Sequence, residues 1–217
     1  MATRQVRKSK AGKRIGRPGE NDATDVRAEI LKVSEGLFAD QGYAATSLRE
    51  IADAAGVNPA MIHYYFSNKE ALLRAVLEKA IEPLANMIEA MKHADAVAPE
   101  EIAGQLMTLV ARHPKLPYLI IREVMLPGGV MQEHFAQHLA PRLGGAVPGL
   151  LEREASAGRI RKDLPSSIGA MAILSLALFP FIVRPVAEQV MDVQLGGDHL
   201  DTFRSQISEF VKRGFSK

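Results

Sequence analysis

The stretch Ser47–Phe66, SLREIADAAGVNPAMIHYYF, decides the fold of this chain. Ser47 and Glu50 have the spacing of a capping box, so a helix is expected to begin there. Gly56 tolerates the positive φ that a tight turn between two helices requires. The dipeptide Asn58–Pro59 then supplies an N-cap and a first helical residue for the next helix. The stretch therefore predicts two short helices joined by a tight turn.

The apolar residues of this stretch fit the same arrangement. Ala52 and Ala55 are small enough for the two helices to approach closely. Six larger residues fall at spacings that point inward or onto the preceding helix: Leu48, Ile51, Val57, Ile62, Tyr65 and Phe66. A tight turn, small contact residues and a shared core together indicate a helix-turn-helix, a motif that places its second helix in the major groove of DNA.

The rest of the chain also has the pattern of helices. Apolar residues recur at helical spacing, and Gly- and Pro-containing turns separate the segments. Gly42 is expected to end the first helix, a second capping box is expected at Ser67–Glu70, and Pro83 predicts a kink. No run alternates as a strand would. An all-α fold follows. Helices are expected near 24–41, from 47, from 58 and from 67 onward, and near 99–112, 116–126, 130–157, 166–190 and 200–214, with a disturbance at Gly144–Gly145 and Pro148 in the one at 130–157.

The positive charge of the chain lies at its beginning. Residues 1–20 hold seven basic residues and one acid, whereas the other 197 residues have a net charge of −4. Lys13–Pro18 resembles the Gly-Arg-Pro core of minor-groove AT-hooks, so we hypothesise that Arg14 and Arg17 enter the minor groove. A solubilising tail is the alternative interpretation.

Several other classes of protein are disfavoured. Cysteine is absent, and the sequence contains no P-loop, dinucleotide fingerprint or nucleophile elbow, so we expect neither an enzyme nor a cofactor. His134 and His138 could lie on one helix face, but no third ligand completes a metal site by spacing. The longest apolar run, 168–183, is shorter than a membrane span, and the first residues lack the apolar segment expected of a signal peptide. These features favour a cytoplasmic location without a membrane partner.

Around the helix-turn-helix the sequence resembles the TetR/AcrR transcription regulators. The resemblance rests on Gly42–Tyr43, Thr46–Ala52, Ala55–Val57 and Ile62–Glu70 and covers about residues 24–72. It implies a homodimeric, usually repressing regulator whose second domain binds a small molecule and releases DNA. The expected parts are a basic arm (1–20), a three-helix DNA-binding domain (21–68) and a helical ligand-binding and dimerisation domain (69–217).

The resemblance also places DNA contacts on this chain. The start of the recognition helix and its exposed side would enter the major groove. At one of these positions the chain departs from the family, because His63 stands where relatives often carry Tyr. Other residues would position the domain on phosphates. The residues are Ser47, Arg49, Asn58, Pro59, Ala60, Met61, His63, Tyr64 and Lys69. Ser47 acting only as a cap, and Arg49 as a solvated charge, are the alternatives.

A ligand pocket is expected in the second domain. Flexible and aromatic side chains suit a largely apolar effector, although ordinary core packing explains each of them equally well. The candidates are Met87, Met91, Met107, Tyr118, Arg122, Met125, Phe135 and Phe179. Arg122 and Glu123 are adjacent charges in an apolar helix, so one faces the pocket or both are solvated or lie at a dimer rim.

The helices near 166–190 and 200–214 are expected to form the dimer interface. The first of them is apolar over most of its circumference, so it must be buried on more than one side. Burial within one monomer is the alternative. A DNA-binding regulator without a small effector, constitutive or switched by a protein partner, is the second interpretation of the whole chain.

Overall fold

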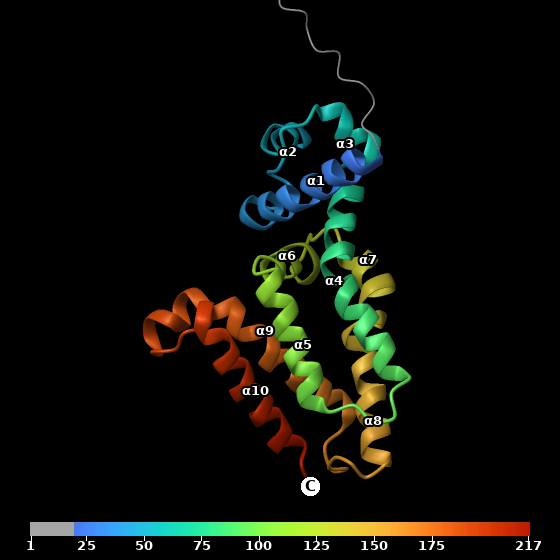
Figure 1. The fold of residues 1–217 in the computed structure, drawn as a ribbon, viewed down its shortest axis with the longest axis vertical. Coiled ribbons are helices and arrows are strands. Elements are labelled where there is room, and N and C mark those ends of the chain that lie inside the picture. The colour runs from blue at the N-terminus through green and yellow to red at the C-terminus, as the bar shows by residue number, and fades with distance from the viewer. Residues whose placement is uncertain (1–19) are drawn as a thin grey trace, which may run out of the picture.

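The protein is described by a computed structural model that covers residues 20–217, with side chains from residue 25 onward. Arg14 and Arg17 lie outside the described residues. Three helices, α1 (Glu20–Gln41), α2 (Leu48–Ala54) and α3 (Pro59–Tyr65), form a head at one end of an elongated molecule (Figure 1). The long helix α4 (Lys69–Lys92) runs from this head into the second part of the molecule.

The second part is built from helices of very different length. The longest are α5 (Pro99–Arg112), α8 (Val147–Ser156), α9 (Ser166–Val190) and α10 (Leu200–Phe215). Short and irregular turns lie between them: α6 (Leu116–Ile120), the π-helix η1 (Ile121–Met125), α7 (Gln132–His134), the π-helix η2 (Phe135–Leu139), and the 3₁₀ turns η3 (Ala140–Arg142), η4 (Gly144–Ala146) and η5 (Gly197–His199). The described residues contain no strand, which confirms the all-α prediction.

Two sequence predictions about helices were wrong. The helix expected over residues 130–157, with a disturbance at Gly144–Gly145 and Pro148, is interrupted over a longer stretch, from Phe135 to Ala146, where Pro141 and the pair Gly144–Gly145 disfavour a regular α-helix; Pro148 is tolerated at the start of α8. The capping box expected at Ser67 is also absent. Asn68 is the N-cap of α4 instead, and its side-chain oxygen accepts the Ala71 N–H at 2.8 Å.

Helix α4 packs against both the head and the second part of the molecule through its buried face. Its apolar residues contact α1 in the head and α5 and α8 below, and Leu72, Leu73 and Leu77 are fully buried. Pro83 lies inside α4 without ending it. The central helix α5 packs against α4, α9 and α10, so the head is attached to a single continuous core.

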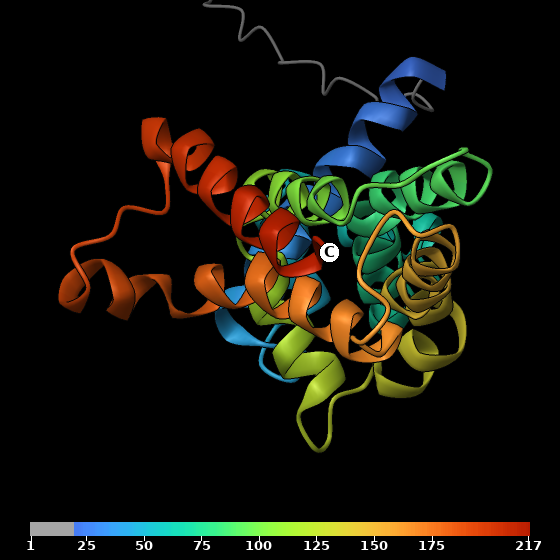
Figure 2. The same ribbon diagram turned by 90° about the horizontal axis from the view of Figure 1, so that it is seen from below.

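The end of α9 and the start of α10 project from the rest of the molecule, as both views show (Figures 1 and 2). Helix α9 is the one described helix that is long and apolar enough, by length and composition alone, to cross a membrane. A single helix of this kind is weak evidence for a span. The N-terminal part of α9 packs on α5 and α8, which fits an element of a helical core.

Candidate DNA interface and cavity

The helix-turn-helix has the local bonds that its sequence predicts. The Ser47 hydroxyl accepts the Glu50 N–H at 3.1 Å, and the Glu50 carboxylate faces the Ser47 N–H, which completes the capping box. After α2, Val57 N–H bonds the Ala52 carbonyl at 2.9 Å and Gly56 N–H bonds the Asp53 carbonyl at 3.2 Å. This is a Schellman turn, and the φ of +66° at Gly56 is the conformation for which glycine is favoured.

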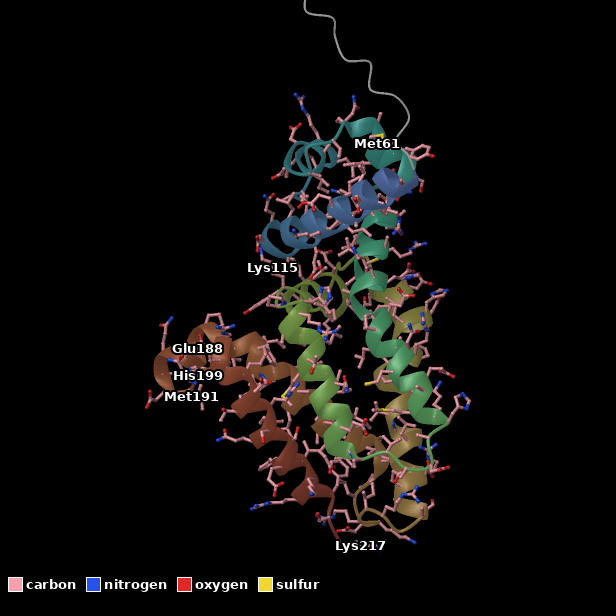
Figure 3. All side chains as sticks on the ribbon, viewed as in Figure 1. Met61, Lys115, Glu188, Met191, His199 and Lys217 are labelled. Carbon is pink, nitrogen blue, oxygen red and sulfur yellow. The ribbon has the colours of Figure 1, made fainter. Side chains whose placement is uncertain are left out.

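Helix α3 presents one open face on the head. Asn58 caps its start by accepting the Ala60 N–H at 2.9 Å, while Ile62 is fully buried beneath it. Tyr64 is 69% exposed, and its ring makes an edge contact with Tyr65 at 5.0 Å between centroids. Pro59, Ala60 and His63 are also exposed, and Met61 is half-buried near the upper end of the head (Figure 3). The predicted contact residues of this helix therefore share an accessible surface.

The residues predicted to contact phosphates differ in how many of their hydrogen-bond donors are available to a ligand. Arg49 is exposed on α2, and the Ser47 hydroxyl keeps a proton to donate while it accepts the cap bond. Lys69 donates from Nζ to the carbonyls of Tyr43 (2.7 Å) and Thr46 (2.9 Å), and Nζ lies 4.3 Å from the centre of the Tyr43 ring. One of its three N–H groups is left, so the structural role of Lys69 is compatible with the predicted phosphate contact, which stays a prediction.

A cavity of about 350 Å³ lies in the second part of the molecule, between α4, α5, η1, η2 and α9. Its wall is almost entirely apolar. Residues from each of these elements line it, including Leu84, Leu109, Ile121, Met125, Phe135 and Leu178. The wall holds no charged side chain, so this space suits an apolar molecule.

Only Met125 and Phe135 of the eight predicted pocket residues line this cavity. Met91 and Met107 are buried in the core, and Met87 lines a smaller cleft between α4 and α5. Tyr118 donates from its hydroxyl to the carbonyls of α9, and Phe179 is exposed. Arg122 lies against Gly42 of the head. The pocket prediction selected unusual residue types, whereas ordinary Leu and Ile residues form most of the wall.

A set of contacts between the head and the second part was missed at the sequence level. The Tyr43 N–H donates to the buried Glu123 carboxylate at 3.0 Å. Burial and the nearby carboxylates of Glu70 and Glu123 raise the pKa of the Tyr43 phenol. No local pattern signals these contacts, because the partners lie far apart in the sequence.

Helices α9 and α10 carry apolar residues that the described chain leaves uncovered. Phe181 and Phe203 face each other between the two helices with ring centroids 6.4 Å apart. On their outer sides Ile168, Met171, Phe179 and Phe210 are each more than half exposed. Exposed large apolar residues that gather on one pair of helices indicate an interaction surface.

Comparison with known proteins agrees with this geometry. The sequence model of the bacterial regulatory proteins of the tetR family matches residues 30–76, which span the helix-turn-helix. The chain is 29% identical over 203 residues to the HTH-type transcriptional repressor NicS of Pseudomonas putida, covering 90% of this chain and 94% of that repressor. It is 30% identical over 140 residues to an HTH-type transcriptional repressor of Streptomyces coelicolor, covering 60% of this chain and 69% of that repressor.

The chain belongs to the TetR family. It is therefore a DNA-binding transcription regulator and not an enzyme, as the sequence predicted. The structure of the Bacillus subtilis regulator FadR in complex with stearoyl-CoA shares the fold of this TetR-family chain. The two superpose with a TM-score of 0.64 at 18% identity, covering 87% of this chain and 98% of that one.

Proposed function

We propose that this regulator is a homodimeric repressor that a small apolar effector releases from its DNA operator. The observation that carries the proposal is the apolar cavity of about 350 Å³, which lies beside the segment that contacts the head. The chain is similar to two proteins named as repressors, and the FadR structure of the same fold holds an acyl-CoA. A cytoplasmic location is part of the proposal, because the similar repressors are bacterial and bacterial chromosomal DNA lies in the cytoplasm.

The recognition surface of α3 is poor in hydrogen-bond donors. Pro59, Ala60 and Met61 offer apolar contacts such as those with thymine methyl groups, while His63 and Tyr64 supply the polar atoms. Ser47, Arg49, the remaining N–H of Lys69 and the hydroxyl of Tyr64 would contact the phosphates around this surface, while Asn58 starts the helix at the major groove. In the full chain, Arg14 and Arg17 would add minor-groove contacts.

Replacement of Tyr64 by Ala tests this surface. We expect operator affinity to fall roughly 100-fold, because a hydrogen bond to a charged phosphate contributes about 1.5 kcal/mol and the dimer loses two of them. The operator is first recovered as the genomic fragments that the wild-type protein retains, and affinity is then measured by fluorescence anisotropy. Tyr64→Phe separates the hydroxyl from the ring. If Tyr64→Ala has unchanged helicity and binds the operator with wild-type affinity, the proposal that α3 contacts DNA is wrong.

The cavity determines the class of effector. Its volume lies near the lower end of the roughly 300–1,000 Å³ of ligand sites, and its wall offers no charge to pair with an ionised ligand. Burial of an unpaired charge there would be costly. We therefore propose a compact neutral compound, or the apolar part of a larger one, as the ligand.

Binding of N-phenyl-1-naphthylamine, a neutral apolar fluorescent probe, tests the cavity. We expect saturable binding at one site per subunit and a rise in melting temperature, because a ligand that binds the native state stabilises it. Leu178→Trp, which narrows the cavity, should weaken probe binding at least tenfold, whereas Gln189→Trp on the same helix should not. Equal binding by both variants, or none by the wild type, would favour a regulator without a small effector, constitutive or switched by a protein partner.

The exposed apolar face of α9 and α10 is the proposed dimer interface. Pairing of this face with that of a second copy would form a four-helix contact and cover Met171, Phe179 and Phe210. It would also explain why a helix as apolar as α9 has much of its surface uncovered in one chain.

A further inference from the structure

Glu123 is the buried member of the junction between the head and the second part of the molecule. Only 5% of the residue is exposed, and its carboxylate accepts the N–H of Tyr43 at 3.0 Å. Tyr43 follows Gly42, where α1 ends with a φ of +89°. The bond therefore holds the point at which the chain turns from α1 toward the helix-turn-helix.

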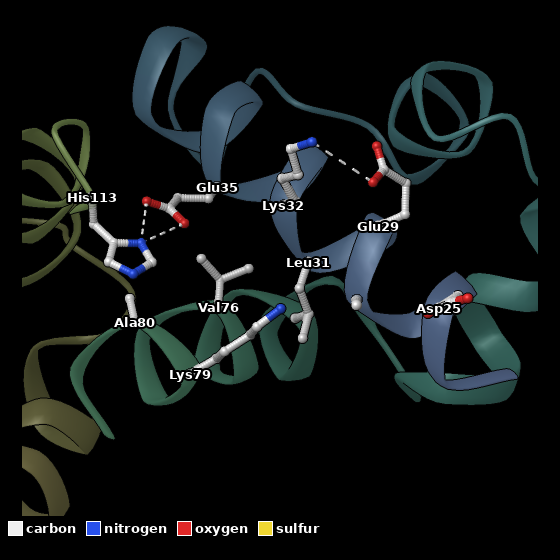
Figure 4. A pocket seen from close by; sticks show the side chains of 10 residues that line it. Asp25, Glu29, Leu31, Lys32, Glu35, Val76, Lys79, Ala80 and His113 are labelled. Carbon is white, nitrogen blue, oxygen red and sulfur yellow. Dashed lines mark hydrogen bonds and ion pairs between the residues drawn. The ribbon is translucent and has the colours of Figure 1, made fainter. Parts of the chain in front are cut away.

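Two other pairs lie at the same junction but are more exposed. Glu35 on α1 bonds His113 Nδ1 at 3.1 and 3.2 Å (Figure 4). Asp40 pairs with Lys115 at 2.5 Å, and both side chains are about half exposed. Lys115 lies where the head faces the second part (Figure 3). The exposed Asp40–Lys115 pair contributes little to the free energy, and the Glu35–His113 side chains are still 20% and 28% exposed, so the Glu123 bond is the most buried of the three restraints.

The main chain of Glu123 is held by the turn that follows it, whereas its side chain is held by Tyr43. Its carbonyl accepts the Met131 N–H at 2.9 Å, after the chain has reversed direction through the Pro127–Gly129 turn. Gly129 lies so close that an added Cβ would stand 2.5 Å from the Glu123 carbonyl. Only glycine therefore fits at position 129, where the two backbone segments come close together. Glu123 is fixed both by its main chain and by its side chain.

The segment that carries Glu123 is also a wall of the cavity. Glu123 lies in the π-helix η1, and Ile121 and Met125, two residues before and after it, line the cavity. A π-helix is a rare, less regular turn that is often found at functional sites. A ligand that shifts the backbone of this segment would therefore also shift Glu123, the residue that holds Tyr43.

We propose that Glu123 is the positioning residue that sets the pose of the DNA-binding head, and that ligand binding acts on the head by withdrawing Glu123 from the Tyr43 N–H. The positioning role of Glu123 is argued from the bond and its burial. The effect of the ligand on that bond rests on the proposed effector function of the cavity. With the bond intact, the head keeps the pose that binds DNA; once the bond is lost, that pose is a smaller share of the population and the apparent affinity falls.

Glu123→Ala and Glu123→Gln test both parts of the proposal in the full-length protein. Gln keeps an acceptor oxygen of the same reach and should retain the wild-type behaviour. Ala should lower operator affinity, measured without probe, by about 5- to 100-fold, because the Tyr43 N–H loses its partner. Ala should also bring the ratio of operator affinities without and with N-phenyl-1-naphthylamine close to one, from a wild-type ratio of about 5 to 150.

Glu133→Ala is the matched control, since it removes an exposed carboxylate nearby that bonds only Gln137 among the described residues. Probe affinity measured without DNA should rise in Glu123→Ala, because the ligand no longer has to break the bond, and should stay at the wild-type value in Glu123→Gln and Glu133→Ala. Wild-type operator affinity in Glu123→Ala, or an equal loss in Glu123→Gln, would overturn the positioning role. If the wild type fails to bind the probe, the effector function fails, and the comparison of probe-free affinities still decides the role of Glu123.

Discussion

Lysine in place of both Met171 and Phe210 is expected to convert the protein to monomers and to lower operator affinity at least 100-fold. The two side chains are 63% and 64% exposed on α9 and α10, so the substitutions are tolerated within one chain. In a paired interface the same ammonium groups would be buried without partners, which costs several kcal/mol per subunit. Loss of the second head then removes the gain of about 10²–10⁴ in affinity that two linked sites provide.

Sedimentation velocity measures the subunit mass, and anisotropy measures the affinity for the operator. Ser205→Lys adds the same charge at an exposed polar position of α10 and should leave the dimer intact. A double-lysine variant that sediments as a wild-type dimer would show that the subunits associate through another surface. A monomer that binds the operator with wild-type affinity would show that one head is sufficient.

The head could be predicted from the sequence because its determinants are local. A capping box needs residues three apart, and a Schellman turn needs a glycine directly after a helix; Ser47, Glu50 and Gly56 meet these requirements within ten positions. The family resemblance added the functional meaning of α3. Ser67 shows the limit of this reasoning, since Asn68 beside it is an equally good cap and is the one used.

The cavity could not be located in the same way. Its space arises where the backbone leaves the α-helical path in η1 and around Gly144–Gly145, and hydrophobic periodicity carries no signal for such irregularity. Arg122 and Glu123 illustrate the consequence. The sequence left open whether one of them faces the pocket, whereas in the structure both point to the junction, with Arg122 against Gly42 and Glu123 on the Tyr43 N–H.

The second large effect is expected for Glu154→Gln, which should lower the free energy of unfolding by about 3 kcal/mol at pH 7. Only 2% of Glu154 is exposed, and its carboxylate binds the Arg159 guanidinium through two hydrogen bonds and lies 3.6 Å from Arg153. Arg153 in turn donates to the carbonyls of Met91 and Lys92 at the end of α4. Loss of one partner of a buried pair costs about 3–5 kcal/mol, and the partial exposure of Arg159 favours the lower value.

The pH dependence distinguishes this ion pair from simple packing. The hydrogen bonds from Arg159 lower the pKa of Glu154 below its usual 4.5, so the native state binds its proton less readily than the unfolded state does. The stabilisation is therefore fully present above about pH 4.5 and is lost as the pH falls through the native pKa. In urea titrations the difference between wild type and Glu154→Gln should be largest near neutral pH and shrink in acid, while Glu152→Gln, an exposed neighbour, should show little difference at any pH. A difference that stays constant from pH 7 to pH 3 would mean that the carboxylate charge does not stabilise the junction of α8 with α4.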